Sequence, residues 1–192
     1  MTIITILGNG ESRNNINLNS IETVKIGCNA IIRDHEVDHL VCVDRKMVIE
    51  AQSYNFPKIY TRTDWANNFG GVLAVPELPF TGDNKWNDPF HWGSGPYAVL
   101  LGCNLAKVVH LVGFDLYSST NYINNMYKGT VNYNSIDHRA IDPRFWIAQI
   151  GGLINHFSFH TFVIHQPITW ELPNLWRGEN VFVDNSLFGV YN

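Results

Sequence analysis

The most constraining feature of the chain is the alternation of short β-branched runs with segments of helical spacing. Residues 2–7 (TIITIL) form a continuous, largely β-branched run that ends at Gly8-Asn9-Gly10, and residues 107–113 (KVVHLVG) have the pattern of a second buried strand. Strands of a parallel sheet are buried on both faces, so runs of this kind are typical of central parallel strands. Runs that alternate with helices predict βαβ units.

Further elements fit the same pattern. Additional strands are expected at residues 24–27, 40–43, 58–61, 72–75 and 161–165, and helices at residues 94–105 and from about 142 to 156. The tail from residue 167, which carries Trp170, Trp176, Phe182 and Phe188, is expected to pack over the sheet. We predict an α/β fold with a Rossmann-like, mostly parallel sheet and helices on both faces, forming one domain over residues 1–192.

Composition excludes several classes of protein. The 192 residues are 45% hydrophobic and 16% charged, with a formal net charge of -4. A general nucleic-acid binder would need a basic face, so nucleic acid is not an expected partner. An anionic small molecule remains open, because helix N-termini and glycine turns bind phosphate without net positive charge. Cys28, Cys42 and Cys103 lie in apolar runs without CxxC spacing, which indicates free thiols in a reducing compartment.

No segment predicts membrane association or export. The N-terminus lacks a basic leader, and no stretch reaches the ~20 apolar residues that a membrane helix needs. We therefore expect a cytoplasmic protein with no membrane partner.

Polar and glycine residues follow several of the predicted strands. They are Gly8-Asn9-Gly10, Asn29, Asp44 and Gly113-Phe114-Asp115. Right-handed crossovers place the carboxyl ends of parallel strands at one edge of the sheet. The sequence therefore predicts a polar nucleotide-binding cleft along that edge.

Each of these motifs also has a plain structural interpretation. Gly8-Asn9-Gly10 is either a tight turn or a phosphate contact, and it is not a dinucleotide fingerprint because Arg13 stands where the third glycine would be. Asn29 is either a turn or cap residue or a hydrogen-bonding group for a base or sugar. Ser94, before Gly95 and a helical pattern, is either an N-cap or part of an anion site.

Residues 115–138 form a long tyrosine-rich stretch without clear periodicity. Loops of this length are usually functional or mobile, so we predict a lid. His138 follows it directly, and a histidine is the natural general base near neutral pH. The chain has no HExxH, CxxC or GxSxG motif, so neither a protein-bound metal nor a serine triad is expected.

Taken in order, GNGES, CN, SG, GFDLY and a later histidine resemble the bacterial sialyltransferases of the Campylobacter type. A related pattern occurs in flagellin-modification proteins and archaeal pterin diphosphokinases. The sequence around GCNAIIRD and NNMYKGTVNY is similar to that of uncharacterised marine phage proteins. The resemblance covers roughly residues 1–165. It implies a metal-independent transferase without a cofactor, whose partners are a CMP-activated sugar donor and a glycan acceptor.

The resemblance also implies roles for single residues. Asn9 and Asn29 would contact the donor nucleotide, Ser94 and Gly95 its phosphate or a sugar carboxylate, and Gly113 and Phe114 the cytosine ring. Tyr117 and Tyr122 would hydrogen-bond the leaving phosphate, and His138 would deprotonate the acceptor. Gly8, Gly10 and Asp115 complete the expected binding set. The chain departs from the family at His91, where an arginine is expected.

Three functions therefore remain open. The first is the CMP-dependent glycosyltransferase, and the second is a diphosphokinase in which Asp44 and Asp115 would hold Mg²⁺. The third is a non-catalytic nucleotide- or glycan-binding protein. A homo-oligomer is also left open.

Overall fold

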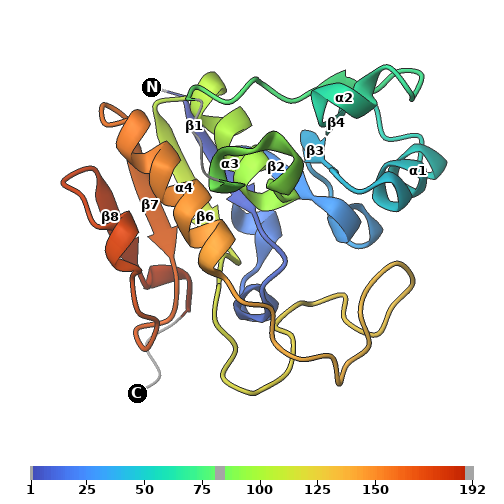
Figure 1. Ribbon diagram of the computed structural model, residues 1–192. Coiled ribbons are helices and arrows are strands. Elements are labelled where there is room, and N and C mark those ends of the chain that lie inside the picture. The colour runs from blue at the N-terminus through green and yellow to red at the C-terminus, as the bar shows by residue number, and fades with distance from the viewer. Residues whose placement is uncertain (1, 81–84, 189–192) are drawn as a thin grey trace.

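Pairwise parallel strands build one sheet in the order β5-β4-β3-β2-β1-β6-β7-β8 (Figure 1). The computed structural model describes residues 2–80 and 85–188. The strands are β1 (Ile3–Leu7), β2 (Val24–Cys28), β3 (His39–Val41), β4 (Ile59–Thr61), β5 (Leu73–Ala74), β6 (Val108–Val112), β7 (Thr161–His165) and β8 (Val181–Asp184). The predicted Rossmann-like sheet is confirmed, and every described strand pair is parallel.

The strand order reverses beside β1. The chain proceeds from β1 outward through β2 to β5, and then returns to place β6 on the other side of β1. The two strands pair in register from Ile3 opposite Val108 to Leu7 opposite Val112. In open α/β sheets, ligands bind in the crevice beyond the carboxyl ends of the strands at such a reversal. The fold therefore indicates that a ligand would bind in the space beyond Leu7 and Val112.

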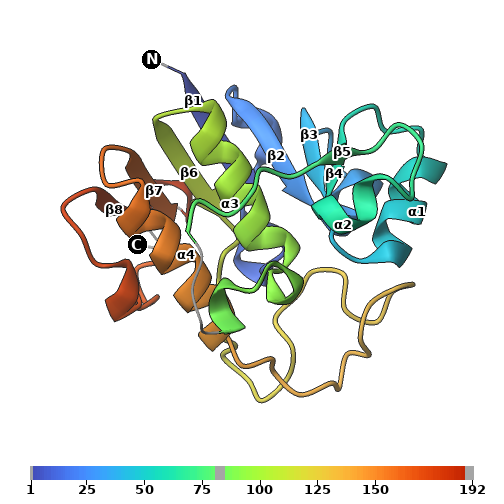
Figure 2. The same cartoon turned by 45° about the horizontal axis from the view of Figure 1, so that its top comes forward.

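Helices cover both faces, as predicted. They are α1 (Arg45–Ser53), α2 (Thr63–Ala66), α3 (Ser94–Leu105) and α4 (Arg144–His156). Helices α3 and α4 lie side by side over one face of the sheet (Figures 1 and 2). Short 3₁₀ turns complete the structure at Glu11–Asn15, Leu18–Ser20, Asn29–Arg33, Lys85–Asn87, Pro89–His91, Asn174–Trp176 and Ser186–Phe188.

The alternation of side chains along β1 divides the core into two layers. Ile4 and Ile6 join the layer under α3 and α4, whereas Leu7 joins the layer that contains Met47 and Val48 of α1. Helix α3 packs closely on β1 because it has Gly102 at the contact, where a Cβ atom would lie 2.7 Å from the Ile6 side chain. Burial of these apolar side chains is the main stabilising contribution to the fold.

The tail only partly follows the prediction. Trp176 is fully buried and its indole N–H donates to the Ile147 carbonyl oxygen (2.9 Å), so this part of the tail does pack on α4. Residues Val181–Asp184 instead extend the sheet as β8, which leaves the Phe182 side chain 54% exposed. The reason is that a β-branched and aromatic run (VFVD) can pair with the open edge of β7. The expectation that Phe182 covers the sheet was wrong.

Two general features bear on the expected environment. Cys28, Cys42 and Cys103 are buried free thiols, and burial raises the pKa of Cys28 and of Cys103 to about 12. Within residues 2–80 and 85–188, no helix combines the length and the apolar character needed to cross a bilayer.

A buried histidine makes the fold sensitive to acid. Burial, together with His110 at 2.8 Å, lowers the pKa of His165 from about 6.5 to about 4. The unfolded chain therefore takes up a proton at this residue at higher pH than the native state does. The stability contributed by neutral His165 is complete above pH 6.5 and is lost as the pH falls toward 4.

We predict that His165→Gln flattens the pH dependence of stability between pH 6.5 and 4. The variant carries no titrating group at this position, so the slope falls by up to about one proton's worth. Urea unfolding at half-unit pH steps measures it. Parallel curves for wild type and variant across this window would contradict the assignment.

Candidate functional site

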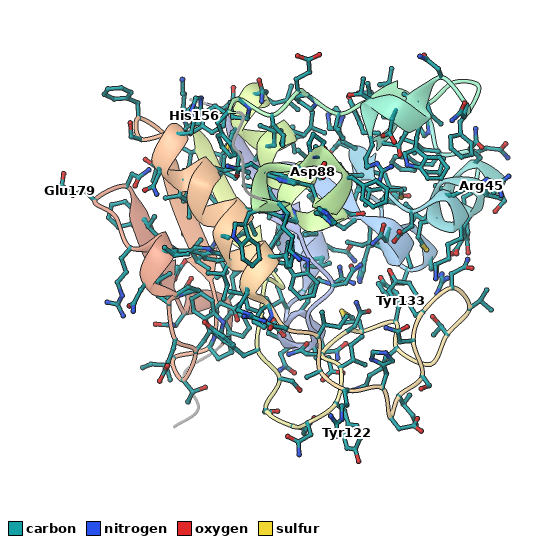
Figure 3. All side chains as sticks on the ribbon, in the orientation of Figure 1. Arg45, Asp88, Tyr122, Tyr133, His156 and Glu179 are labelled. Carbon is teal, nitrogen blue, oxygen red and sulfur yellow. The ribbon has the colours of Figure 1, made fainter. Side chains whose placement is uncertain are left out.

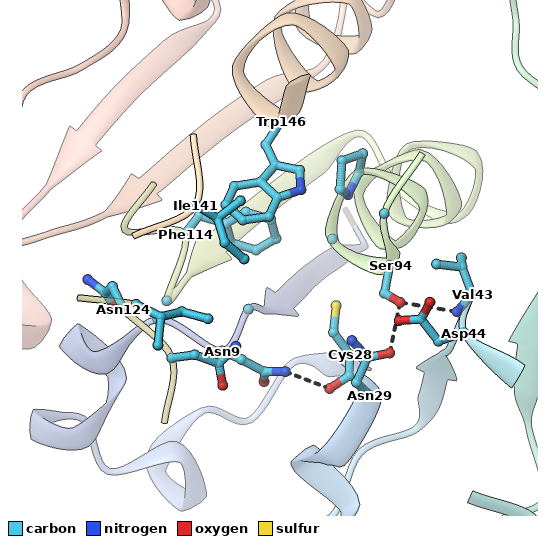
Figure 4. A pocket seen from close by; sticks show the side chains of 18 of the residues that line it. Asn9, Cys28, Asn29, Val43, Asp44, Ser94, Phe114, Asn124, Ile141 and Trp146 are labelled. Atoms are coloured by element: carbon cyan, nitrogen blue, oxygen red, sulfur yellow. Dashed lines mark hydrogen bonds between the residues drawn. The ribbon is translucent and has the colours of Figure 1, made fainter. Parts of the chain in front are cut away.

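A cavity of about 580 Å³ opens where the ends of β1, β2, β3 and β6 meet the start of α3 (Figure 4). This volume is within the usual range for small-molecule sites. All nine residues expected to bind substrate line it: Gly8, Asn9, Gly10, Asn29, Ser94, Gly95, Gly113, Phe114 and Asp115. The structure therefore brings the residues that follow the strands, Asp44 included, together with the helix start at Ser94 and Gly95.

Glycines at the ends of β1 and β6 form the floor of the cavity. The Gly8 N–H donates to the Val112 carbonyl (2.8 Å) and the Gly10 N–H to the Gly113 carbonyl (2.9 Å), which continues the pairing past the strands. Gly113 has a φ of +72°, a conformation that favours glycine. A Cβ atom on Gly8 would overlap the Gly113 carbonyl oxygen. The close approach of these two turns therefore requires glycine.

Asp115 fixes the first turn. Its carboxylate accepts hydrogen bonds from the Ser12 N–H (2.8 Å) and the Ser12 hydroxyl (2.5 Å), and Gln166 donates to it at 3.4 Å. The side chain is 6% exposed. Asp115 thus borders the cavity while its oxygens hold the loop that follows Gly10.

A buried arginine orients Asn9. The Arg13 guanidinium is 1% exposed and donates to the Gly8 carbonyl (2.8 Å) and to the Asn9 Oδ1 (3.2 Å). The Asn9 amide nitrogen consequently points the other way and donates to the Cys28 carbonyl (3.1 Å; Figure 4). The residue that excludes a dinucleotide fingerprint is therefore the one that sets the amide in place.

A hydrogen-bonded chain links three segments on the other side of the cavity. The Val43 N–H donates to the Ser94 hydroxyl (3.1 Å), which donates to the Asn29 Oδ1 (2.8 Å; Figure 4). Asn29 adopts a left-handed conformation with a φ of +53°, which asparagine tolerates better than most residues. Because its oxygen accepts from Ser94, its amide N–H groups remain as donors for a ligand.

Two helix N-termini border the same cavity. Gly93, which has no side chain, caps α3. Asp44 caps α1, and its side chain forms no hydrogen bond to the first turn of that helix. Ser94, for which an N-cap was one interpretation, is instead the first residue of α3, and its hydroxyl is used in the chain to Asn29. The first turn of α1 holds Lys46, which also lines the cavity. Free N–H groups and partial positive charge at helix starts favour anions.

The opposite wall is apolar and aromatic. Phe114, Ile141 and Trp146 lie together above the strand ends (Figure 4). The Phe114 ring also lies close to Gly95, where a Cβ atom would be 3.3 Å away. The cavity therefore offers hydrogen-bond donors on one side and flat apolar surface on the other, an arrangement suited to an anion attached to a ring.

The predicted lid has an inner part that is firmly attached. The Met126 N–H donates to the Asn9 carbonyl (2.9 Å), and the Tyr127 hydroxyl accepts from Arg13 (2.9 Å) and donates to Asp34 (2.7 Å). Tyr133 lines the cavity and lies 3.4 Å from the Asn9 amide. Burial raises the pKa of both tyrosines, so their hydroxyls stay protonated.

Arg33 secures the far side of this inner part. It forms a bidentate pair with Glu50 of α1 (2.5 and 2.9 Å) and donates to Thr130 (2.7 Å) and to the Val131 carbonyl (2.8 Å). The hydrogen bonds from Arg33 lower the pKa of Glu50, to which Asn132 also donates (2.7 Å). Residues 126–133 are thus held against the second face of the sheet.

The outer part of the lid carries the predicted catalytic residues and is exposed. Tyr122 and Arg139 form an antiparallel bridge, and the Ile123 N–H donates to the His138 carbonyl (2.9 Å). Tyr117 and Tyr122 are 41% and 51% exposed, and neither they nor His138 line the cavity. The structure therefore brings Tyr122 and His138 together on a ribbon that projects below the sheet (Figures 1 and 3).

Several lining residues had no role in the sequence prediction. They are mainly Lys46, Arg62, Asn124, Asn132, Tyr133 and Trp146. Arg62 follows β4 directly, so the rule that found Asp44 after β3 would have found it too. Lys46 lies on α1, and the others lie on the predicted lid or on α4, where no local pattern identifies a residue that faces the cavity. Among the described residues, no three His, Cys, Asp or Glu side chains are grouped to hold a metal ion.

We predict that Gly8→Ala lowers the free energy of unfolding by about 1–3 kcal/mol, as overpacking usually does, because backbone lies on the side where the methyl group must go. Gly70→Ala is the matched control, since its Cβ atom would meet nothing within 4 Å. Chemical denaturation of both variants measures the difference. Equal stabilities would show that the two turns separate easily.

We predict that Ser94→Ala weakens binding of the expected nucleotide about fivefold, the usual effect of losing a bond worth ~1 kcal/mol, because the Asn29 amide is no longer held. Ser53→Ala removes an exposed hydroxyl that bonds only the Glu50 carbonyl, so it serves as control. Calorimetric titration with CMP compares the two. An unchanged affinity in Ser94→Ala would show that this hydroxyl does not contribute to binding.

Comparisons with known proteins bear on the fold. No protein-family model matches the sequence, and no curated protein matches it significantly. The solved structure of the monofunctional α-2,3-sialyltransferase Cst-I from Campylobacter jejuni is similar, with a TM-score of 0.58 and 16% identity over 85% of this chain and 75% of that chain. A point variant of the sialyltransferase CST-II in complex with CMP gives a TM-score of 0.41 and 14% identity over 85% and 81%. CstII from Campylobacter jejuni with cytidine-5'-monophosphate gives 0.39 and 13% over 85% and 79%. The chain therefore has a sialyltransferase-like fold.

Proposed function

We propose that this protein is a glycosyltransferase that uses a CMP-activated sugar. The observation that carries the proposal is the pairing of the Asn29–Ser94 donor chain and the start of α3 with the Phe114–Trp146 wall, across one cavity. The sialyltransferase-like fold supports it, because the similarity to Cst-I extends over most of this chain. The donor set accommodates an anion and the wall accommodates a base.

In this proposal each side of the cavity takes one part of the donor. The cytosine ring lies against Gly113 and Phe114, and Asn9 and Asn29 contact the nucleotide. The phosphate or a sugar carboxylate meets Ser94 and Gly95 at the start of α3. Lys46 adds a positive charge at the rim. A donor with two anionic groups would use both helix starts that border the cavity.

The reaction breaks the bond between the anomeric carbon and a phosphate oxygen while the acceptor hydroxyl oxygen bonds that carbon. His138 takes the hydroxyl proton, and Tyr117 and Tyr122 donate to the leaving phosphate. Burial and the nearby Glu171 raise the pKa of Tyr117, so its hydroxyl retains the proton it must donate. Because these groups lie outside the cavity, the mechanism requires the outer ribbon of the lid to close over the donor.

One observation favours a second function, a non-catalytic nucleotide- or glycan-binding protein. His138 is exposed and does not line the cavity, as expected of a residue that takes no part in a reaction there. In the diphosphokinase alternative, Asp44 and Asp115 would bind Mg²⁺, but the Asp115 oxygens already accept from Ser12. The resemblance to pterin diphosphokinases belongs to the diphosphokinase alternative, and the resemblance to phage proteins belongs to the non-catalytic binding protein.

The test separates the three functions. We predict that CMP raises the unfolding temperature in EDTA, because a ligand of the native state stabilises it by mass action. An effect of ATP that needs Mg²⁺ would favour the diphosphokinase. Binding of CMP without turnover of any CMP-sugar would favour the binding protein.

We predict that His138→Ala lowers transfer or hydrolysis of a CMP-sugar about 10²–10⁴-fold, the usual effect of losing a general base. His35→Ala is the control, since that residue lies outside the cavity. Steady-state rates and CMP titrations are measured on both. Equal rates would exclude His138 as the base.

A further inference from the structure

A second cavity of about 1010 Å³ adjoins the first. Arg62 and Phe90 line both cavities, so these two residues form a shared wall. The remaining described lining comes from residues 63–64, 76–80 and 85–89 and from Tyr97 of α3. Asp88, at the front of the molecule in Figure 3, belongs to this lining.

The shared wall is well fixed. The Arg62 side chain donates to both oxygens of Asp64 (3.0 and 2.6 Å), and its guanidinium lies over the Phe90 ring, 4.8 Å from the centroid. Arg62 is only 8% exposed, whereas Phe90 is 67% exposed. The arginine therefore positions an aromatic ring that has its own surface available to a ligand.

The charges around the second cavity argue against an anionic ligand. Its described lining holds three carboxylates, Asp64, Glu77 and Asp88, against two cations, Arg62 and Lys85. Arg62 is paired with Asp64, and the Lys85 ammonium lies over the Phe145 ring at 5.4 Å. Glu77 and Asp88 therefore leave the local balance negative, and a like charge brought against them is unfavourable.

The polar groups and the aromatic ring together match one class of ligand. Carboxylates accept hydrogen bonds from vicinal hydroxyls, amides both accept from and donate to them, and an exposed ring packs on the apolar face of a sugar. Glu77, Asn87 and Asp88 supply the polar groups, and Phe90 supplies the ring at the border with the first cavity.

We propose that the second cavity binds the acceptor, and that the acceptor is an uncharged glycan rather than an acidic one. This inference rests on the proposed function and adds the location and the charge class of the second substrate. The terminal sugar packs on Phe90, with its reacting hydroxyl directed past Arg62 into the first cavity.

The test uses lactose as a neutral glycan and 3′-sialyllactose as its acidic counterpart. Saturation-transfer NMR on the full chain, with saturating CMP, measures binding of each. We expect lactose to bind at least about tenfold more tightly than sialyllactose, and Phe90→Ala to weaken lactose binding by a similar factor. Glu77→Lys should reduce this preference about tenfold, because it reverses a charge of the second cavity alone.

Glu179→Lys is the matched control, an exposed glutamate at the far edge of the molecule (Figure 3). It should keep the wild-type preference. Equal binding of the two glycans to the wild type, or an identical preference in Glu77→Lys and Glu179→Lys, would overturn the inference. Absence of lactose binding while CMP binds would overturn it and leave the proposed function standing. Absence of CMP binding would remove the proposed function, and with it the assignment of this cavity to an acceptor.

Discussion

The parallel pairing of β1 with β6 is the interaction on which the rest of the site depends. It continues beyond the strands through the Gly8 and Gly10 N–H groups, so that two glycine turns lie in direct contact. The reversal of strand order at this point leaves the space above the turns free of any crossover connection. The position of the cavity follows from chain topology before any side chain is considered.

Several side chains around the cavity hold other groups in position for a ligand. Arg13 and Asp115 do not reach toward a ligand but hold the turns that do. Ser94 has the same effect on Asn29, since it fixes which end of the amide faces the cavity. Polar groups that are held in place before a ligand arrives lose less conformational entropy on binding. The buried network is thus consistent with a site prepared for a polar ligand.

The predicted lid over residues 115–138 divides into an inner and an outer part that differ in how firmly they are held. Its inner part is tied to the sheet by Arg13 and Arg33, whose guanidinium groups lie over the rings of the buried Tyr127 and the half-buried Tyr133. Its outer part has few contacts and carries Tyr122, the predicted hydrogen-bond donor to the leaving phosphate, and His138, the predicted base. Segments with few buried contacts open and close at low free-energy cost. A lid that closes needs an inner part that stays attached to the sheet and an outer part that is loosely held, and residues 115–138 have both.

The sequence was sufficient for the sheet and for the floor of the site, because both follow from local patterns. Runs such as TIITIL and KVVHLVG predicted central strands, and residues that follow strands were predicted to meet. The edge strand β8 was missed because VFVD is short and its pairing with β7 is a tertiary contact. Trp146 and Tyr133 were missed for a similar reason, since their direction depends on how α4 and the lid pack.

The structural role of Arg13 could not be predicted from the sequence. The sequence identified it as the residue that breaks a dinucleotide motif, but not as a buried cation that orients Asn9 and holds Tyr127. Nothing local showed that Arg13 is buried, because Tyr127, which accepts from its guanidinium, lies more than a hundred residues away in the sequence.

The most direct test of the account is a crystal structure of the protein with CMP, grown in EDTA. We expect the phosphate of CMP to lie at the start of α3, within hydrogen-bond distance of the Ser94 or Gly95 N–H groups, and the cytosine ring to lie against Phe114. A nucleotide bound elsewhere, or a cavity that stays empty at saturating CMP, would contradict it.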